Sequence, residues 1–327
     1  MPRPALLAAL ALLAGCETFV EPDPADYDPV LDVRAVFEPG VPWSVDVALT
    51  VPINGEPSRF PWGVPTATVT VTADDGTAVV LPRVPGDEFR QGLYGAVPIY
   101  RSGLTPIDAP AFEDGPAPEA GRAYTLRVEA PGYPPVVARS RAPLALGHDA
   151  AFVSGWERRD GGTVDGRPVV TYDDVALDVR LAPVPGGVYP LLSFTAVETE
   201  EDADGVRRRY GCSTSFFTGA PVLREATFVE DVQAGARRRL FEAFLDADAL
   251  GPRPFRVEVE HPCGEVIRAE VAAASPEFYL AVRTRARAEA AERNPFAEPV
   301  PAYSNVEGGA GLFAGLTRRW VAVRRPD

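Results

Sequence analysis

The residue with the clearest chemical role in this chain is Cys16, which ends a short apolar leader. Arg3 supplies a positive charge near the start, residues 5–13 form an apolar run of nine, and two small residues directly precede the cysteine. This order is typical of a bacterial lipoprotein signal, in which a peptidase cuts before the cysteine and the thiol then carries lipid. Nine apolar residues are too few to span a bilayer. We therefore expect residues 1–15 to be a signal peptide and Cys16 to be the lipid acceptor.

Two further cysteines, Cys212 and Cys263, lie in the second half of the chain. An exported protein matures outside the cytoplasm, where disulfides persist, and an even number of remaining thiols favours pairing. We predict a Cys212–Cys263 bridge, with two separate buried thiols as the alternative.

Nucleophilic and metal chemistry have little support, because the chain has only two histidines. We expect His148 to be a solvated residue of an inter-domain linker and His261 to mark the end of a strand. No Gly-x-Ser-x-Gly elbow is present, and two histidines beside a bridged cysteine pair are too few for a zinc site. Residues 309–314 (GAGLFA) match a dinucleotide fingerprint, but no βαβ unit surrounds them. We therefore expect no catalytic residue, no metal and no cofactor.

Aromatic and acidic residues leave two other kinds of site open. Of the four tryptophans, Trp62 is the candidate ligand contact, because it lies in the loop-like run Phe60–Gly63, whereas most of the others are expected in the core. Glycoside hydrolysis needs two facing carboxylates, and acidic residues are too abundant here for the sequence to select a pair.

The charge balance of the chain excludes nucleic acid as a partner. Basic residues number 32 against 46 acidic ones, every basic side chain is an arginine, and the net charge is −14. Such a field repels phosphate backbones. No stretch after the leader reaches the roughly 20 apolar residues of a membrane helix. We expect contact with the membrane only through the lipid anchor.

The first half of the chain has the pattern of a β-sandwich. Residues 16–29 are acidic and contain several prolines, which predicts an extended tether. From there, apolar residues alternate with polar ones in several short segments separated by turn residues, and Asp74-Asp75-Gly76 predicts a hairpin. We assign residues 30–143 to an immunoglobulin- or transthyretin-like domain, with residues 93–121 as a long loop.

Residues 144–327 are predicted to form a second β-rich domain. Strand patterns recur up to residue 259, with a hairpin turn at residues 203–205, whereas residues 240–245 fit a strand or a helical turn equally well. One helix is predicted over residues 275–293, because Ser275 is a good N-cap and Pro276 is favoured in a first turn. The fold class is therefore mainly β, with two β-sandwich-like domains and one helix in the second.

The C-terminal region carries a recognisable motif. It runs from Asn294-Pro295-Phe296 through Ser304-Asn305 to the glycine-rich residues 308–315 (GGAGLFAG). Together with the lipid-acceptor sequence at Cys16 and residues 67–76, 121–128 and 275–279, it resembles the domain-of-unknown-function 4249 family of Bacteroidota lipoproteins. The resemblance implies an outer-membrane location, on the periplasmic or the cell-surface side, and a neighbouring TonB-dependent receptor, without an activity.

The glycine-rich motif has its own physical interpretation. We predict a closing strand that seats Leu312 and Phe313 in the core of the second domain, with a binding loop as the alternative. For the whole chain, the leading hypothesis is a non-enzymatic lipoprotein that assists an outer-membrane receptor. The alternatives are a tethered protein that captures a glycan, peptide or other nutrient, and a hydrolase with paired carboxylates; the sequence names no small-molecule ligand.

Overall fold

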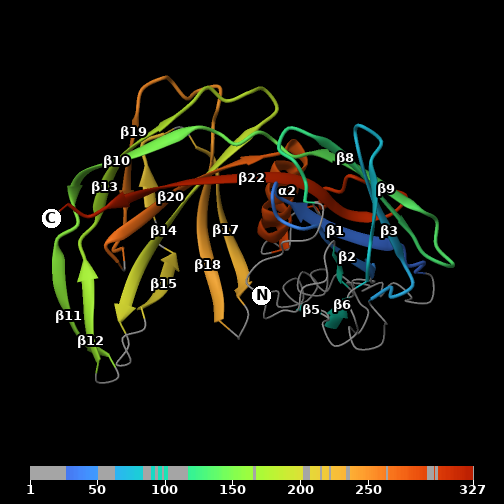
Figure 1. Cartoon of the computed structure of the whole chain (residues 1–327), viewed down its shortest axis with the longest axis horizontal. Coiled ribbons are helices and arrows are strands. Elements are labelled where there is room, and N and C mark those ends of the chain that lie inside the picture. Colours follow the sequence, from blue (N-terminus) through green and yellow to red (C-terminus); the bar gives the residue numbers. More distant parts are fainter. Residues whose placement is uncertain are drawn as a thin grey trace, which may run out of the picture.

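The computed structural model shows a mainly β protein with a helix at its centre (Figure 1). The structure describes residues 27–50, 63–83, 90–92, 95–97, 99–101, 117–164, 167–201, 207–213, 216–220, 222–232, 236–262, 264–292, 298 and 301–326. The predicted signal peptide and most of the predicted tether lie outside these residues. The mainly β, multi-sheet architecture confirms the predicted fold class.

A five-stranded sheet has the order β21-β9-β8-β3-β4. Its strands are β3 (Thr68–Ala73), β4 (Ala78–Leu81), β8 (Ala123–Glu129), β9 (Val136–Arg141) and β21 (Val306–Glu307). Strands β3 and β4 pair antiparallel around the turn at residues 74–76, so the predicted hairpin is confirmed. The last strand of this sheet comes from the C-terminal motif, which therefore returns to the first half of the chain.

A nine-stranded sheet runs through the whole molecule in the order β17-β18-β14-β20-β22-β1-β2-β7, with β15 paired to β14. Its strands are β1 (Leu31–Phe37), β2 (Ser44–Leu49), β7 (Ile99–Arg101), β14 (Tyr189–Glu201), β15 (Arg207–Ser213), β17 (Val222–Val232), β18 (Ala236–Leu245), β20 (Val266–Ala274) and β22 (Ala310–Arg324). Strands β14 and β15 pair antiparallel, whereas the turn predicted at residues 203–205 lies outside the described residues.

Three smaller sheets complete the architecture. The four-stranded sheet has the order β10-β13-β19-β16, and β11-β12 and β5-β6 form separate hairpins. Their strands are β5 (Arg90–Gly92), β6 (Gly95–Val97), β10 (His148–Gly155), β11 (Arg158–Val164), β12 (Arg167–Tyr172), β13 (Val175–Leu181), β16 (Phe216–Thr218) and β19 (Phe255–Val259). The four-stranded sheet packs on the nine-stranded one through a shared apolar core.

Strand β22 connects the two halves of the molecule and crosses the view in Figure 1. Its first part pairs parallel with β1, from Ala310 opposite Asp32 to Gly315 opposite Phe37. Its second part pairs antiparallel with β20, from Leu316 opposite Ala274 to Arg324 opposite Val266. The predicted closing strand is therefore present, and it belongs to both halves.

The position of Phe313 differs from the prediction. Its fully buried ring packs with Phe37 and Trp43 at centroid distances of 4.7 and 6.1 Å, in the core of the first half. Leu312 points to the other face of β22. There it packs against a separate apolar cluster, which includes Phe278 and Tyr279 of the helix over residues 276–292. Apolar content alone predicted burial for both residues but not which core each would enter. The domain division at residue 143 remains a prediction.

The glycines of the motif allow close backbone contact. A Cβ atom on Gly315 would lie 2.1 Å from the carbonyl oxygen of Arg141. At Gly311, which has a φ of +120°, the same atom would lie 1.9 Å from the carbonyl oxygen of Val33. Since only glycine fits at these distances, the motif is explained by packing of β22 against β1 and β9.

Helix α2 (Pro276–Glu292) confirms the helix predicted over residues 275–293. Ser275 caps it, because its hydroxyl accepts from the backbone N–H of Phe278 at 3.4 Å. Phe278 and Tyr279 are buried against β22 and its neighbours, and the Tyr279 ring stacks on Tyr189 at 4.1 Å. The helix therefore covers part of one face of the nine-stranded sheet.

Two local expectations are corrected. The segment 93–121, predicted as a loop, begins with β6 and β7, and β7 extends the large sheet by pairing with β2. These three-residue strands are too short to show an alternating pattern. Residues 240–245, for which two interpretations were open, belong to β18.

Candidate functional site

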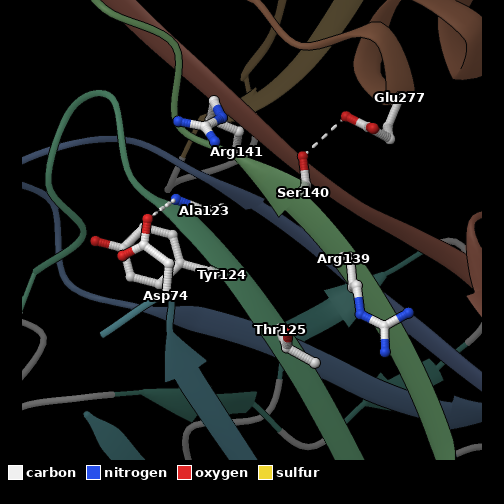
Figure 2. A pocket seen from close by; sticks show the side chains of 8 residues that line it. All are labelled: Asp74, Ala123, Tyr124, Thr125, Arg139, Ser140, Arg141 and Glu277. Carbon is white, nitrogen blue, oxygen red and sulfur yellow. Dashed lines mark hydrogen bonds between the residues drawn. The ribbon is translucent and has the colours of Figure 1, made fainter. Parts of the chain in front are cut away.

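The best-formed depression among the described residues lies where β8, β9 and α2 meet (Figure 2). It has a volume of about 290 Å³. It is lined by Asp74, Ala123, Tyr124, Thr125, Arg139, Ser140, Arg141 and Glu277. Because strands of the first half and the helix of the second half both contribute, the pocket marks the junction of the two.

Ser140 is the central residue of this junction. Its hydroxyl donates to Glu277 Oε2 at 2.9 Å and accepts from the backbone N–H of Gly315 at 3.2 Å. The hydroxyl of Ser275 lies 3.4 Å away. Ser140 and Ser275 are 7% and 1% exposed, so these hydrogen bonds are shielded from water. The Ser140 hydroxyl therefore acts both as a donor and as an acceptor at the junction.

The local sequence explains why a serine lies at this point. On β9, Val136, Ala138 and Ser140 alternate toward the interior. The first two enter the core, whereas Ser140 meets β22 at Gly315, whose missing side chain leaves space for the contact. Ser275 extends the same network by donating its backbone N–H to the Gly315 carbonyl at 3.0 Å.

A second charged cluster surrounds Arg122 at one end of the pocket. Its guanidinium contacts Asp74 at 3.2 Å, Asp75 at 2.5 Å and Glu119 at 3.2 Å. The backbone N–H of Thr77 and then Arg122 lower the pKa of Asp75 to about 2. The backbone N–H of Ala123 and Arg122 also lower the pKa of Asp74. Both carboxylates are therefore ionised anchors of the β3–β4 turn.

Tyr124 and Arg141 of the pocket also have partners in the protein. Tyr124 accepts from the backbone N–H of Glu119 at 2.7 Å, and burial raises the pKa of its hydroxyl. Arg141 donates to the carbonyl of Gly121 at 2.5 Å. The pocket is therefore suited to holding the fold together and to weak contact with a small polar group. It offers no activated nucleophile, since His148 and His261 form their contacts elsewhere.

Asn305 fixes the approach of the C-terminal motif to this junction. Its side chain exchanges two hydrogen bonds with the backbone of Phe313, at 2.8 and 2.9 Å, and donates a third to the carbonyl of Arg139 at 3.1 Å. The Ser-Asn part of the motif thus ties the loop before β22 to β9. Together with the glycines, it has a structural explanation that requires no ligand.

Several predicted site residues lie outside the described part of the chain. These are Cys16, Trp62 and Cys263. Cys212 lies on β15, where its backbone is opposite Ala196 of β14. Lipidation, the ligand contact at Trp62 and the Cys212–Cys263 bridge therefore stay predictions.

His148 is not the solvated linker residue that we expected. It is 6% exposed, and its Nε2 atom lies 3.0 Å from the carbonyl oxygen of Ala269. Because a carbonyl can only accept, Nε2 carries the proton, and Nδ1 is buried without a partner among the described residues. The reason for the difference is that β10 begins at His148 and brings it onto β20. His261 follows the end of β19, as predicted; its side chain is exposed and its Nδ1 atom lies 3.0 Å from Asp174.

The tryptophans divide into buried and exposed members. Trp43 and Trp156 are each 2% exposed, which confirms the expectation that most are core residues. Trp320 is 51% exposed on β22. Sequence reasoning did not select it, because the face of the sheet to which it points depends on the pairing of β22 with β20.

Metal-binding clusters and membrane-spanning helices are absent from the described residues. No group of three or more histidine, cysteine, aspartate or glutamate side chains is arranged to hold a metal ion there. Within the same part of the chain, no helix combines the length and the apolar character needed to cross a membrane.

Comparison with known proteins shows no match to a protein-family profile and none to a curated protein. Among solved structures, the chain is similar to the T6 backbone pilin of Streptococcus pyogenes, with 8% identity and a TM-score of 0.17. That match covers 90% of this chain, which spans 64% of the length of the pilin. The collagen binding domain of the Erysipelothrix rhusiopathiae surface protein RspB also matches, with 8% identity, coverage of 89% and 96%, and a TM-score of 0.14. At these scores neither likeness bears on function.

Proposed function

We propose that this chain is a non-enzymatic lipoprotein, anchored through Cys16 in the outer membrane, that serves as an accessory partner of a receptor complex of the TonB-dependent type. The lipid-acceptor sequence and the resemblance of the C-terminal motif supply the location and the kind of partner. Its function is then to present a folded surface beside the receptor.

The observation that carries the non-enzymatic part is the use made of the C-terminal motif. Asn305 forms hydrogen bonds with the backbone of β9 and β22. Gly315 has no side chain, so Ser140 has space at the junction and accepts from the Gly315 backbone N–H. These groups hold the two halves of the protein together. The side chains of the motif that form hydrogen bonds are used in this way, and none of them is left for a reaction. A motif that serves packing supports a scaffold whose function resides on its outer surfaces.

Lipidation is tested with a Cys16→Ser chain expressed in the native host. We expect the unchanged chain to incorporate labelled palmitate and to fractionate with the outer membrane, whereas Cys16→Ser does neither. A Cys212→Ser, Cys263→Ser double variant is the matched control, because it retains the lipid acceptor while losing the other thiols. Membrane association of Cys16→Ser at the level of the unchanged chain would contradict the anchor.

The partner is tested by cross-linking intact cells, purifying the chain from detergent-solubilised outer membrane and identifying the proteins that accompany it. Recovery of one receptor in stoichiometric amount supports the accessory function. Recovery of no specific protein would overturn it and favour the alternative, in which the tethered protein captures a glycan, peptide or other nutrient by itself.

A further inference from the structure

One face of the nine-stranded sheet is only partly covered. Residues that face each other across paired strands share a face, and Leu191, Ala272 and Leu316 mark the part of this face that packs under α2. Beyond the helix the same face is more exposed on β20 and β22, and we call this part the uncovered face. It carries the exposed residues Arg318, Trp320, Ala322 and Arg324 and the half-buried Arg268 and Glu270, whereas Ser193 on the neighbouring strand β14 is 8% exposed.

Trp320 is the largest side chain on this uncovered face. It lies opposite Glu270 of β20, and the Arg268 guanidinium is 4.6 Å from its ring centroid. On the reverse face of the same strands, Ile267, Ala269 and Val323 fill the core, so the alternation places the tryptophan outward. A half-exposed tryptophan stacked with an arginine combines the two residue types most enriched at the centres of protein interfaces.

The contact between Arg268 and the Trp320 ring preorganises both side chains for binding. Fixing a flexible side chain on association costs free energy, and here each side chain already restricts the other before a partner arrives. The sheet backbone holds the pair in register, because Arg268 is opposite Ala322 and therefore diagonal to Trp320. The site thus sits on rigid elements, unlike a loop that must be ordered.

The charges on this face indicate which kind of partner could bind there. Arg318 contacts both Glu38, at 3.0 Å, and Glu270, at 3.6 Å, so these carboxylates are already paired. Among the described residues, Arg268 and Arg324 form no ion pair. At physiological salt the Debye length is about 8 Å, so these two cations outweigh the distant acidic surface of the chain at contact range.

We propose that the uncovered face of β20 and β22 is the docking surface for the receptor-complex partner, and that this partner presents a carboxylate-rich segment along Trp320, Arg268 and Arg324. The inference rests on the proposed function and specifies the surface and the partner's chemistry. Trp320 supplies the apolar contact, Arg268 supplies charge-assisted hydrogen bonds beside it, and Arg324 supplies them further along the same face of β22.

The test uses full-length, lipidated chains in the native host. Trp320→Ala and Arg268→Glu remove the apolar and the cationic contact. Phe217→Ala is the matched control, because Phe217 is an aromatic residue that is 65% exposed on β16 of the other sheet. Arg268→Lys keeps the charge. The partner recovered with each chain is quantified relative to the chain itself, and thermal melting checks that each variant is folded.

We expect Trp320→Ala and Arg268→Glu to lower partner recovery at least about tenfold, which corresponds to an interface hot spot. Phe217→Ala and Arg268→Lys should stay within about twofold of the unchanged chain, because charged interfaces tolerate a retained cation better than a reversed one. A photo-cross-linking amino acid at position 320 should label a partner peptide with more carboxylates than basic side chains, and higher salt should weaken recovery.

The possible failures separate the two proposals. If the unchanged chain brings down a stoichiometric partner and Trp320→Ala does so equally well, the docking surface is wrong and the proposed function stands. A photo-adduct on a glycan, or on a neutral or basic peptide, also overturns the docking surface. If the unchanged chain recovers no partner, the proposed function fails, and the docking surface fails with it.

Discussion

Replacing Gly315 by alanine tests whether the junction depends on close backbone contact. The added methyl group would lie 2.1 Å from the carbonyl oxygen of Arg141 and 2.7 Å from its carbonyl carbon, so β22 and β9 must separate by about 1 Å to restore normal contact distances. Overpacking of this kind costs about 1–3 kcal/mol. The separation also breaks the hydrogen bond from the backbone N–H of Gly315 to Ser140 of β9, at about 1 kcal/mol. We expect a loss of about 2–4 kcal/mol in unfolding free energy.

Equilibrium urea unfolding measures this loss, with tryptophan fluorescence and far-UV circular dichroism as the two signals. Trp43 and Trp156 are buried in the first and second cores, so fluorescence reports on both halves. Gly186→Ala is the control, because an added Cβ there has no neighbour within 4 Å, and it should leave stability unchanged or raise it by up to about 1 kcal/mol. A Gly315→Ala chain within about 0.5 kcal/mol of the unchanged protein would refute the packing explanation of the motif.

Three further predictions concern other contacts. The pKa of Asp75 falls from its ordinary 3.8 to about 2 on folding. Its contribution to stability is therefore complete above pH 4 and is lost as the pH falls toward 2. Over this pH range, the melting temperature of the Asp75→Asn chain should fall less than that of the unchanged chain. Asn305→Ala removes three hydrogen bonds and should lower unfolding free energy by about 2–3 kcal/mol in urea, and no change would contradict the role of the motif. Alkylation without reductant should leave Cys212 and Cys263 unmodified in the exported protein; two alkylated thiols would exclude the bridge.

The parts of the fold that follow from local physics could be predicted from the sequence. The turn at residues 74–76 has a glycine with positive φ between two strands with alternating burial, and the hairpin formed there. Ser275 and Pro276 defined the start of α2 within a residue. Strands as short as residues 216–218 also coincided with apolar clusters. In each case the signal and the structure lie within a few residues of one another.

The parts that depend on long-range pairing could not be predicted. Phe313 enters the first core because β22 pairs with β1, which is more than 270 residues away in sequence, and no local pattern encodes that choice. His148 is buried because β10 packs on β20, a strand that the sequence analysis missed. Trp320 is exposed because the helix stops short of its part of the sheet. The alternation of residue types over residues 318–324 indicates that the two faces of this strand differ. It does not indicate which of the two faces is covered.

The parallel pairing of β1 with β22 has a mechanical consequence. The predicted tether precedes the N-terminal end of β1 in the sequence, and the Trp320 face lies toward the C-terminal end of β22. A pull between a lipid anchor and a docked partner would draw these parallel strands along each other in opposite directions. The six residue pairs from Asp32–Ala310 to Phe37–Gly315 would then share the load in shear and yield together, not one after another as in peeling. This geometry suits a protein under tension.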